Sequence, residues 1–144
     1  MYKKKNGFTL IEMMVVLLII LGVGALSMKG IPKAMNFWRN YLLTKQAEDM
    51  QKGALDYANS LGHFTGVSCE TLVDENIIDQ SYGDCTTSNP FGGAIDVSEG
   101  DTVYDLVIEF SDVPTINGRA IERKSGEKAV YTEEGGILAW TFKS

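Results

Sequence analysis

The architecture of this chain follows from one stretch, FTLIEMMVVLLIILGVGALSM, which runs for 21 residues from Phe8 to Met28 with Glu12 as its only ionisable residue. As a helix it measures about 31 Å, which is close to the ~30 Å hydrocarbon core of a bilayer. The segment MYKKKNG precedes it, and its three lysines favour a cytoplasmic N-terminus. The sequence therefore predicts an apolar membrane helix over residues 8–30.

A cleaved secretory signal is the alternative that this pattern leaves open. Such a signal has the same basic start but a shorter apolar part of ~7–15 residues, and Gly24–Ser27 offers small residues for cleavage. The length of the run and the acid near its front count against this alternative. An acid inside a bilayer costs roughly 2.5–3.5 kcal/mol. Glu12 therefore either lies at the interface, favoured by the helix dipole, or has a specific cationic partner.

The order Gly7, Phe8, then Thr-Leu-Ile-Glu12, then an unbroken apolar helix, resembles the class III signal of type IV prepilins and pseudopilins. The resemblance implies that residues 1–7 are a leader, removed by a prepilin peptidase that cuts between Gly7 and Phe8. The same enzyme then methylates the new amino group of Phe8. The mature chain has 144 − 7 = 137 residues.

Cleavage gives Glu12 the partner that its position calls for. The new α-amino group of Phe8 has an ordinary pKa of about 7.7–8.0, so it is mostly charged at neutral pH. The resemblance implies that this amine, on a neighbouring subunit, pairs with Glu12 in a helical filament. An opposite charge is worth more in a low dielectric than at a surface, so the pair sets the register of otherwise non-directional helices.

Beyond the apolar segment, Gly30 and Pro32 interrupt the helical pattern, since proline removes a backbone donor and glycine weakens a helix. We expect either a locally unwound stretch over 27–32, in the filament above all, or a harmless kink. Residues 31–61 then read as an amphipathic helix. Its apolar stripe is Ile31, Met35, Trp38, Leu42, Ala47, Met50, Ala54, Ala58 and Leu61.

Residues 62–93 are rich in Gly, Ser, Thr, Asn and Asp and predict a mostly irregular αβ-loop with a short helix capped by Ser68. Cys69 and Cys85 both fall in this loop. A disulfide between them is favoured over two free thiols, since the core is small and the bond contributes on the order of 3 kcal/mol. An oxidised pair places this part of the chain outside the cytoplasm.

Residues 94–144 predict an antiparallel sheet of three or four strands. The residues of 103–111 alternate between apolar and polar, as in a half-buried strand. A hairpin turn is expected at 133–136, and a turn or short helix over 113–127. The strand candidates are 94–98, 103–111, 128–132 and 137–142. Together with the long helix, they predict an α+β pilin fold in which residues 31–144 form the globular domain.

Charge and composition exclude several classes of function. Residues 1–53 carry a net charge of +5 and residues 54–144 a net charge of −11, which argues against specific nucleic-acid binding. One His and two Cys leave little for a zinc site. We find no catalytic constellation, and we predict a non-enzymatic protein with no cofactor and no metal. A small basic cluster at Arg119, Arg123, Lys124 and Lys128 either touches DNA or faces the acidic surface of the next subunit.

The resemblance implies a structural subunit of a type IV pilus that lies in the bacterial inner membrane before assembly and in an extracellular filament afterwards. Its expected partners are further copies of itself, the prepilin peptidase, the inner-membrane assembly machinery and minor pilins. A minor pilin or a secretion pseudopilin is one alternative, and a membrane-anchored binding module that never polymerises is another. The sequence leaves open the type IVa or type IVb subclass and the filament's role in adhesion, motility, DNA uptake, conjugation or secretion.

Overall fold

A computed structural model describes the backbone of residues 10–143 and the side chains of residues 10–21 and 32–143. The first element is the helix α1, Leu10–Leu61, of 52 residues. The chain divides between Phe37 and Trp38 into two units, which are described separately below. The predicted cleavage site lies outside the described residues.

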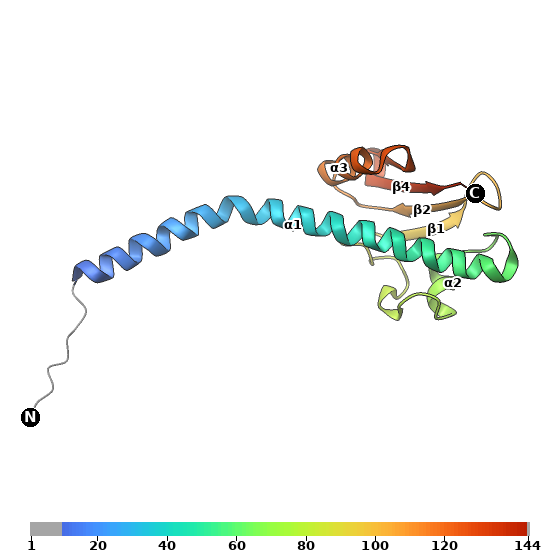
Figure 1. Cartoon of the computed structure of the whole chain (residues 1–144), viewed down its shortest axis with the longest axis horizontal. Coiled ribbons are helices and arrows are strands. Elements are labelled where there is room, and N and C mark those ends of the chain that lie inside the picture. Colours follow the sequence, from blue (N-terminus) through green and yellow to red (C-terminus); the bar gives the residue numbers. More distant parts are fainter. Residues whose placement is uncertain (1–9, 144) are drawn as a thin grey trace, which may run out of the picture. The chain divides into compact units, whose positions relative to one another are not determined.

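The second unit is a helix packed on a sheet. Four strands, β1 (Ile95–Glu99), β2 (Leu106–Phe110), β3 (Ala129–Thr132) and β4 (Ile137–Phe142), form one sheet in the order β1-β2-β4-β3. All three pairings are antiparallel. Figure 1 shows the sheet lying along the C-terminal part of α1. This confirms the predicted α+β, pilin-like architecture.

Alternate residues of the strands face the helix, which follows from the period of two in a strand. Ile108 lies opposite Trp140 in the register, and Tyr131 lies opposite Leu138. All four are at most 5% exposed. The α1 side chains that complete this core are Leu43, Ala47, Met50 and Ala54.

The predicted apolar stripe of α1 was partly wrong. Met35 and Trp38 are 48% and 56% exposed, and Leu61 is also exposed, whereas Leu43 is fully buried. Among the described side chains, the buried stripe of α1 begins at Leu43, whereas the predicted stripe begins at Ile31. The remainder of the prediction, from Ala47 to Ala54, is confirmed.

The αβ-loop contains more structure than its composition indicates. It holds the helix α2 (Cys69–Asp74) and the 3₁₀ turn η1 (Gln80–Tyr82). The amide of Thr71 donates to the Ser68 hydroxyl over 3.1 Å, so the predicted cap is confirmed. Gly62, with φ of +78°, ends α1 in a conformation that a glycine adopts without strain.

The strand boundaries lie within one residue of the prediction except at the start of β2. β2 begins at Leu106 rather than at residue 103, because a turn occupies the residues before it. The Gly100 amide donates to the Asp105 carbonyl over 2.8 Å, and the Thr102 hydroxyl donates to the Asp105 carboxylate over 2.9 Å. The first three residues of the alternating run 103–111 therefore lie in a turn, and only the later ones lie in the strand.

The segment between β2 and β3 is helical. It forms α3, Thr115–Ser125, followed by the 3₁₀ turn η2, Gly126–Lys128. A further 3₁₀ turn, η3 (Glu134–Gly136), lies at the predicted hairpin turn between β3 and β4. There Gly135 and Gly136 have φ of 78° and 60°, which explains why the turn is glycine-rich.

Candidate functional site

The N-terminal part of α1 is the first candidate site, and its side chains are uncovered. Every large apolar side chain from Leu10 to Leu21 is at least 47% exposed, and Leu10 itself is 85% exposed. Glu12 lies in the first turn of the helix, where the dipole favours a carboxylate. Gly7 and Phe8, the predicted cleavage and methylation site, lie outside the described residues.

Within the part of the chain that the structure describes, no helix combines the length and the apolar character needed to cross a membrane. The predicted membrane helix over residues 8–30 lies partly outside the described side chains.

The predicted helix breaker lies within the helix. α1 continues through Gly30, and Pro32 is an interior residue of it. An unwound stretch over 27–32 is therefore absent from the isolated chain. Unwinding in an assembled filament stays a prediction, since Pro32 leaves one helical acceptor without its backbone donor.

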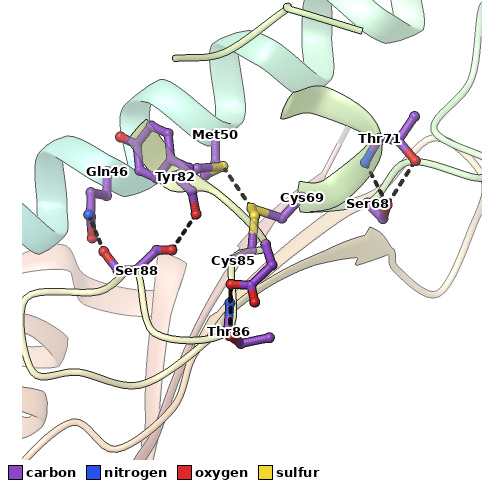
Figure 2. The surroundings of a disulfide bond; sticks show 10 residues. Gln46, Met50, Ser68, Cys69, Thr71, Tyr82, Cys85, Thr86 and Ser88 are labelled. Carbon is purple, nitrogen blue, oxygen red and sulfur yellow. Dashed lines mark hydrogen bonds between the residues drawn. A yellow bond between two sulfur atoms is a disulfide. The ribbon is translucent and has the colours of Figure 1, made fainter. Parts of the chain in front are cut away.

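The disulfide of the αβ-loop is the second candidate feature. Cys69 and Cys85 are bonded, with their Cα atoms 6.2 Å apart, and both are 3% exposed. Figure 2 shows the disulfide lying beneath α1, where the Cys69 sulfur is 3.9 Å from the Met50 sulfur. The bond therefore joins the start of α2, where it contacts α1, to residue 85 of the loop.

Hydrogen bonds attach the part of the αβ-loop that follows the disulfide to its neighbours. The Gln46 side chain of α1 donates to the Ser88 carbonyl over 2.8 Å, and the Ser88 hydroxyl donates to the Tyr82 carbonyl (Figure 2). Asn89 is 4% exposed, and its amide donates to the Ser111 carbonyl over 2.7 Å. The loop is thus bonded to both α1 and the sheet.

Three side chains of this loop have shifted pKa values. Burial raises the pKa of Tyr82 to about 12, and the nearby Asp49 carboxylate adds to this. Hydrogen bonds from Ser81 lower the pKa of Asp79, and hydrogen bonds from Thr86 lower that of Asp84. Both carboxylates therefore stay charged at neutral pH.

The basic cluster lies on α3 and η2. Arg119 forms ion pairs with Glu122, over 3.5 Å, and with Glu133, over 3.0 Å. These neighbours raise the pKa of Arg119, chiefly through the hydrogen bond to Glu133. Arg123 donates to the Arg119 carbonyl over 3.2 Å, and its side chain is exposed together with those of Lys124 and Lys128.

Two contacts on α1 were not predicted. The Asn117 side chain, at 2% exposure, donates to the Asn40 side chain over 2.7 Å and so joins α3 to α1. The Arg39 guanidinium lies 5.7 Å from the centre of the Phe91 ring. A lone asparagine or arginine on a helix gives no signal of such a partner, because the contact joins residues far apart in sequence. Among the described residues, no three His, Cys, Asp or Glu side chains converge to hold a metal.

The comparisons with known proteins agree with the N-terminal motif. The prokaryotic N-terminal methylation motif matches residues 2–27, a class III signal that is typical of type IV pilins and pseudopilins. No curated protein and no solved structure matches the chain.

This motif implies processing by a prepilin peptidase and delivery to a pilus or secretion machinery, from the membrane to a pilus or secreted location. Pilin-like proteins are in general structural and non-enzymatic. The helix on an antiparallel sheet supplies the matching fold. The chain thus combines a class III signal, typical of type IV pilins and pseudopilins, with a pilin-like α+β fold.

Proposed function

We propose that the mature chain is the structural subunit of a type IV pilus, with no enzymatic activity of its own. The observation that carries this proposal is the exposure of every large apolar side chain from Leu10 to Leu21 on a chain with a methylation motif. Burying one such side chain is worth about 1.5–3 kcal/mol. The segment therefore needs other molecules around it, first lipid and then further copies of the chain.

In this proposal the leader, residues 1–7, stays in the cytoplasm and is cut from Phe8, while the disulfide-bonded domain lies on the outer side of the inner membrane. The three lysines of the leader support this orientation. The disulfide between Cys69 and Cys85 supports it as well, since such bonds persist in oxidising compartments.

Transfer from lipid into a filament gains little from the hydrophobic effect, because lipid tails are as apolar as the helices. A polar contact is therefore needed to select the correct packing. We assign this role to Glu12 and the methylated amine of Phe8 on an adjacent subunit. Burying either the Glu12 carboxylate or the Phe8 amine alone is costly, so both leave the membrane interface only when they pair. This pairing sets the register of adjacent helices.

The test is mass spectrometry of the native chain in a sheared cell-surface fraction. A chain that begins with methylated Phe8 is expected. A chain that begins at Met1, or after the small residues Gly24–Ser27, contradicts the proposal in favour of an anchored or secreted module.

The abundance of the chain in the same fraction separates a major pilin from the alternatives. We expect it to be the main component of the filaments, since Glu12 is present and the globular domain is small. A trace amount in filaments built from another protein assigns it instead as a minor pilin or pseudopilin.

A further inference from the structure

Two aromatic side chains of α1 remain uncovered at the start of the second unit. Trp38 and Tyr41 are 56% and 54% exposed, and their ring centroids lie 5.7 Å apart. Residues three apart share one face of a helix. Leu43, which follows closely, is fully buried in the core that α1 forms with the sheet. We call Trp38 and Tyr41 the aromatic pair; it lies directly before the part of α1 that the sheet covers.

The residue types of the pair suit the boundary between a bilayer and water. Tryptophan and tyrosine are enriched there, because each combines a large apolar ring with one polar group. The earlier part of α1, from Leu10 to Leu21, exposes aliphatic and methionine side chains instead. The uncovered surface of the helix therefore changes from a type that suits hydrocarbon to a type that suits the interface.

The position of the pair along the helix matches the thickness of a bilayer. From Glu12 to Trp38 the chain advances 38 − 12 = 26 residues, which correspond to ~39 Å of helix. A bilayer measures ~30 Å across its hydrocarbon core and ~40–45 Å with its headgroup layers. If Glu12 lies in the inner headgroup layer, as the proposed function requires, Trp38 therefore falls in the outer one.

The charges of the same stretch are compatible with this depth. Residues 13–47 include four Lys or Arg and no Asp or Glu. Lys33 and Arg39 are exposed and form no ion pair within the described residues. Long basic side chains near the end of a membrane helix reach out of the hydrocarbon to the phosphates. Residues 54–144 are strongly acidic and oppose an anionic surface, so the aromatic rings rather than net charge must carry the contact.

We propose that the aromatic pair binds the outer headgroup layer of a phospholipid bilayer while the chain is still in the membrane. This inference rests on the proposed function and adds a second fixed point to it. Glu12 holds the helix at the inner interface, and the pair holds it at the outer interface. Interfacial aromatic residues help to set the position of a membrane helix, so the two ends together fix the depth of the apolar segment.

The depth of Trp38 in vesicles tests the proposal. The chain has two tryptophans, and Trp140 is only 5% exposed. The difference in emission between the wild type and Trp38→Phe therefore reports Trp38 without a change in the core. The full chain is reconstituted in phosphatidylcholine vesicles with a nitroxide quencher either on the headgroup or near the bilayer centre. We expect the headgroup label to quench Trp38 about fivefold more than the central label, because the indole prefers the interface.

A tryptophan moved along the same helix is the matched control. Asn59→Trp in the Trp38→Phe background places an indole at an exposed position 59 − 38 = 21 residues further along α1, or ~32 Å, which is outside the bilayer. Aqueous iodide should quench this indole equally with and without vesicles, whereas vesicles should protect Trp38. If vesicles leave the iodide quenching of Trp38 unchanged, the proposal is overturned.

Two further outcomes would assign the pair to other partners and would also overturn the proposal. Protection from iodide that disappears as the ratio of lipid to protein rises indicates contact with a second copy of the chain. Headgroup quenching that requires anionic phosphatidylglycerol indicates that Lys33 and Arg39, not the rings, hold the surface. The depth of Trp38 is measured without filaments, so the absence of filaments from cells contradicts the proposed function and leaves this measurement to decide the inference.

Discussion

Two stretches of the same helix contrast sharply in what surrounds them. From Leu10 to Leu21 each large apolar side chain is about half exposed or more. From Leu43 to Ala54 one face is buried by the chain's own sheet, and Leu43, Met50 and Ala54 are fully covered. A helix that is apolar on all sides needs packing partners on all sides, whereas an amphipathic helix needs a packing partner on one side. We therefore call the second stretch the folding stretch, and the first the assembly stretch after the function proposed for it.

The largest effect is expected at Glu12, in the assembly stretch. Glu12→Val leaves the ammonium of Phe8 without its proposed partner, and an unpaired charge at low dielectric costs several kcal/mol. We expect more than tenfold fewer filaments, with unchanged membrane insertion and leader removal. Electron microscopy of sheared fractions and mass spectrometry of the membrane fraction measure these two quantities.

Glu48→Val is the control for that change. It makes the same substitution at an exposed position of the same helix, where Glu48 forms only a surface ion pair with Lys45. Such pairs are worth at most about 1 kcal/mol, so filaments should form normally. Abundant filaments from Glu12→Val would remove the charge pair from the mechanism.

Two leucines of α1, one in each stretch, test the contrast through the free energy of unfolding. Leu43 is 0% exposed and Leu17 is 56% exposed. Leu43→Ala should lower the free energy of unfolding by about 2–5 kcal/mol, because it leaves a cavity in the core. Leu17→Ala should leave it unchanged. Urea unfolding of the mature chain in detergent, followed by tryptophan fluorescence, gives both values, and equal losses would contradict the contrast.

Removing the disulfide tests how much the stability of the folded domain depends on the αβ-loop. Cys69→Ala with Cys85→Ala should cost about 3 kcal/mol, because it removes a crosslink over 16 residues that lies against Met50. The same unfolding experiment on the reduced wild type should give a matching loss. If neither treatment lowers the stability, the hydrogen bonds of the loop suffice to hold it.

Much of this fold was accessible from local patterns. The residue type and spacing predicted the helix cap at Ser68. They also predicted the crosslink between the two cysteines and the turn at the glycine pair before β4. The α3 helix was foreseen only as one of two options. Its buried Asn117 is satisfied by Asn40, 77 residues away, and no local pattern reports that partner.

The error in the apolar stripe has a similar cause. Trp38 and Leu42 fit the helical period as well as Leu43 does, so hydropathy cannot show which face the sheet covers. The sheet decides this, and it consists of residues more than fifty positions further along the chain. The early stretch, in contrast, is apolar on all sides, and this follows from its composition alone.

The smallest expected effect concerns Tyr82, where the loop approaches α1. Burial and the Asp49 carboxylate raise its pKa to about 12, so ionisation is harder in the folded than in the unfolded chain. The stability from this group is complete below the ordinary pKa of 10.0 and is lost as the pH rises to about 12. Because the side chain is only half-buried, the loss should be near 1 kcal/mol after screening. Absorbance at ~295 nm should show one tyrosine that titrates near pH 12 and is missing from Tyr82→Phe. If that variant keeps the late titration, another tyrosine is responsible, and the loop contacts α1 less closely than Tyr82 indicates.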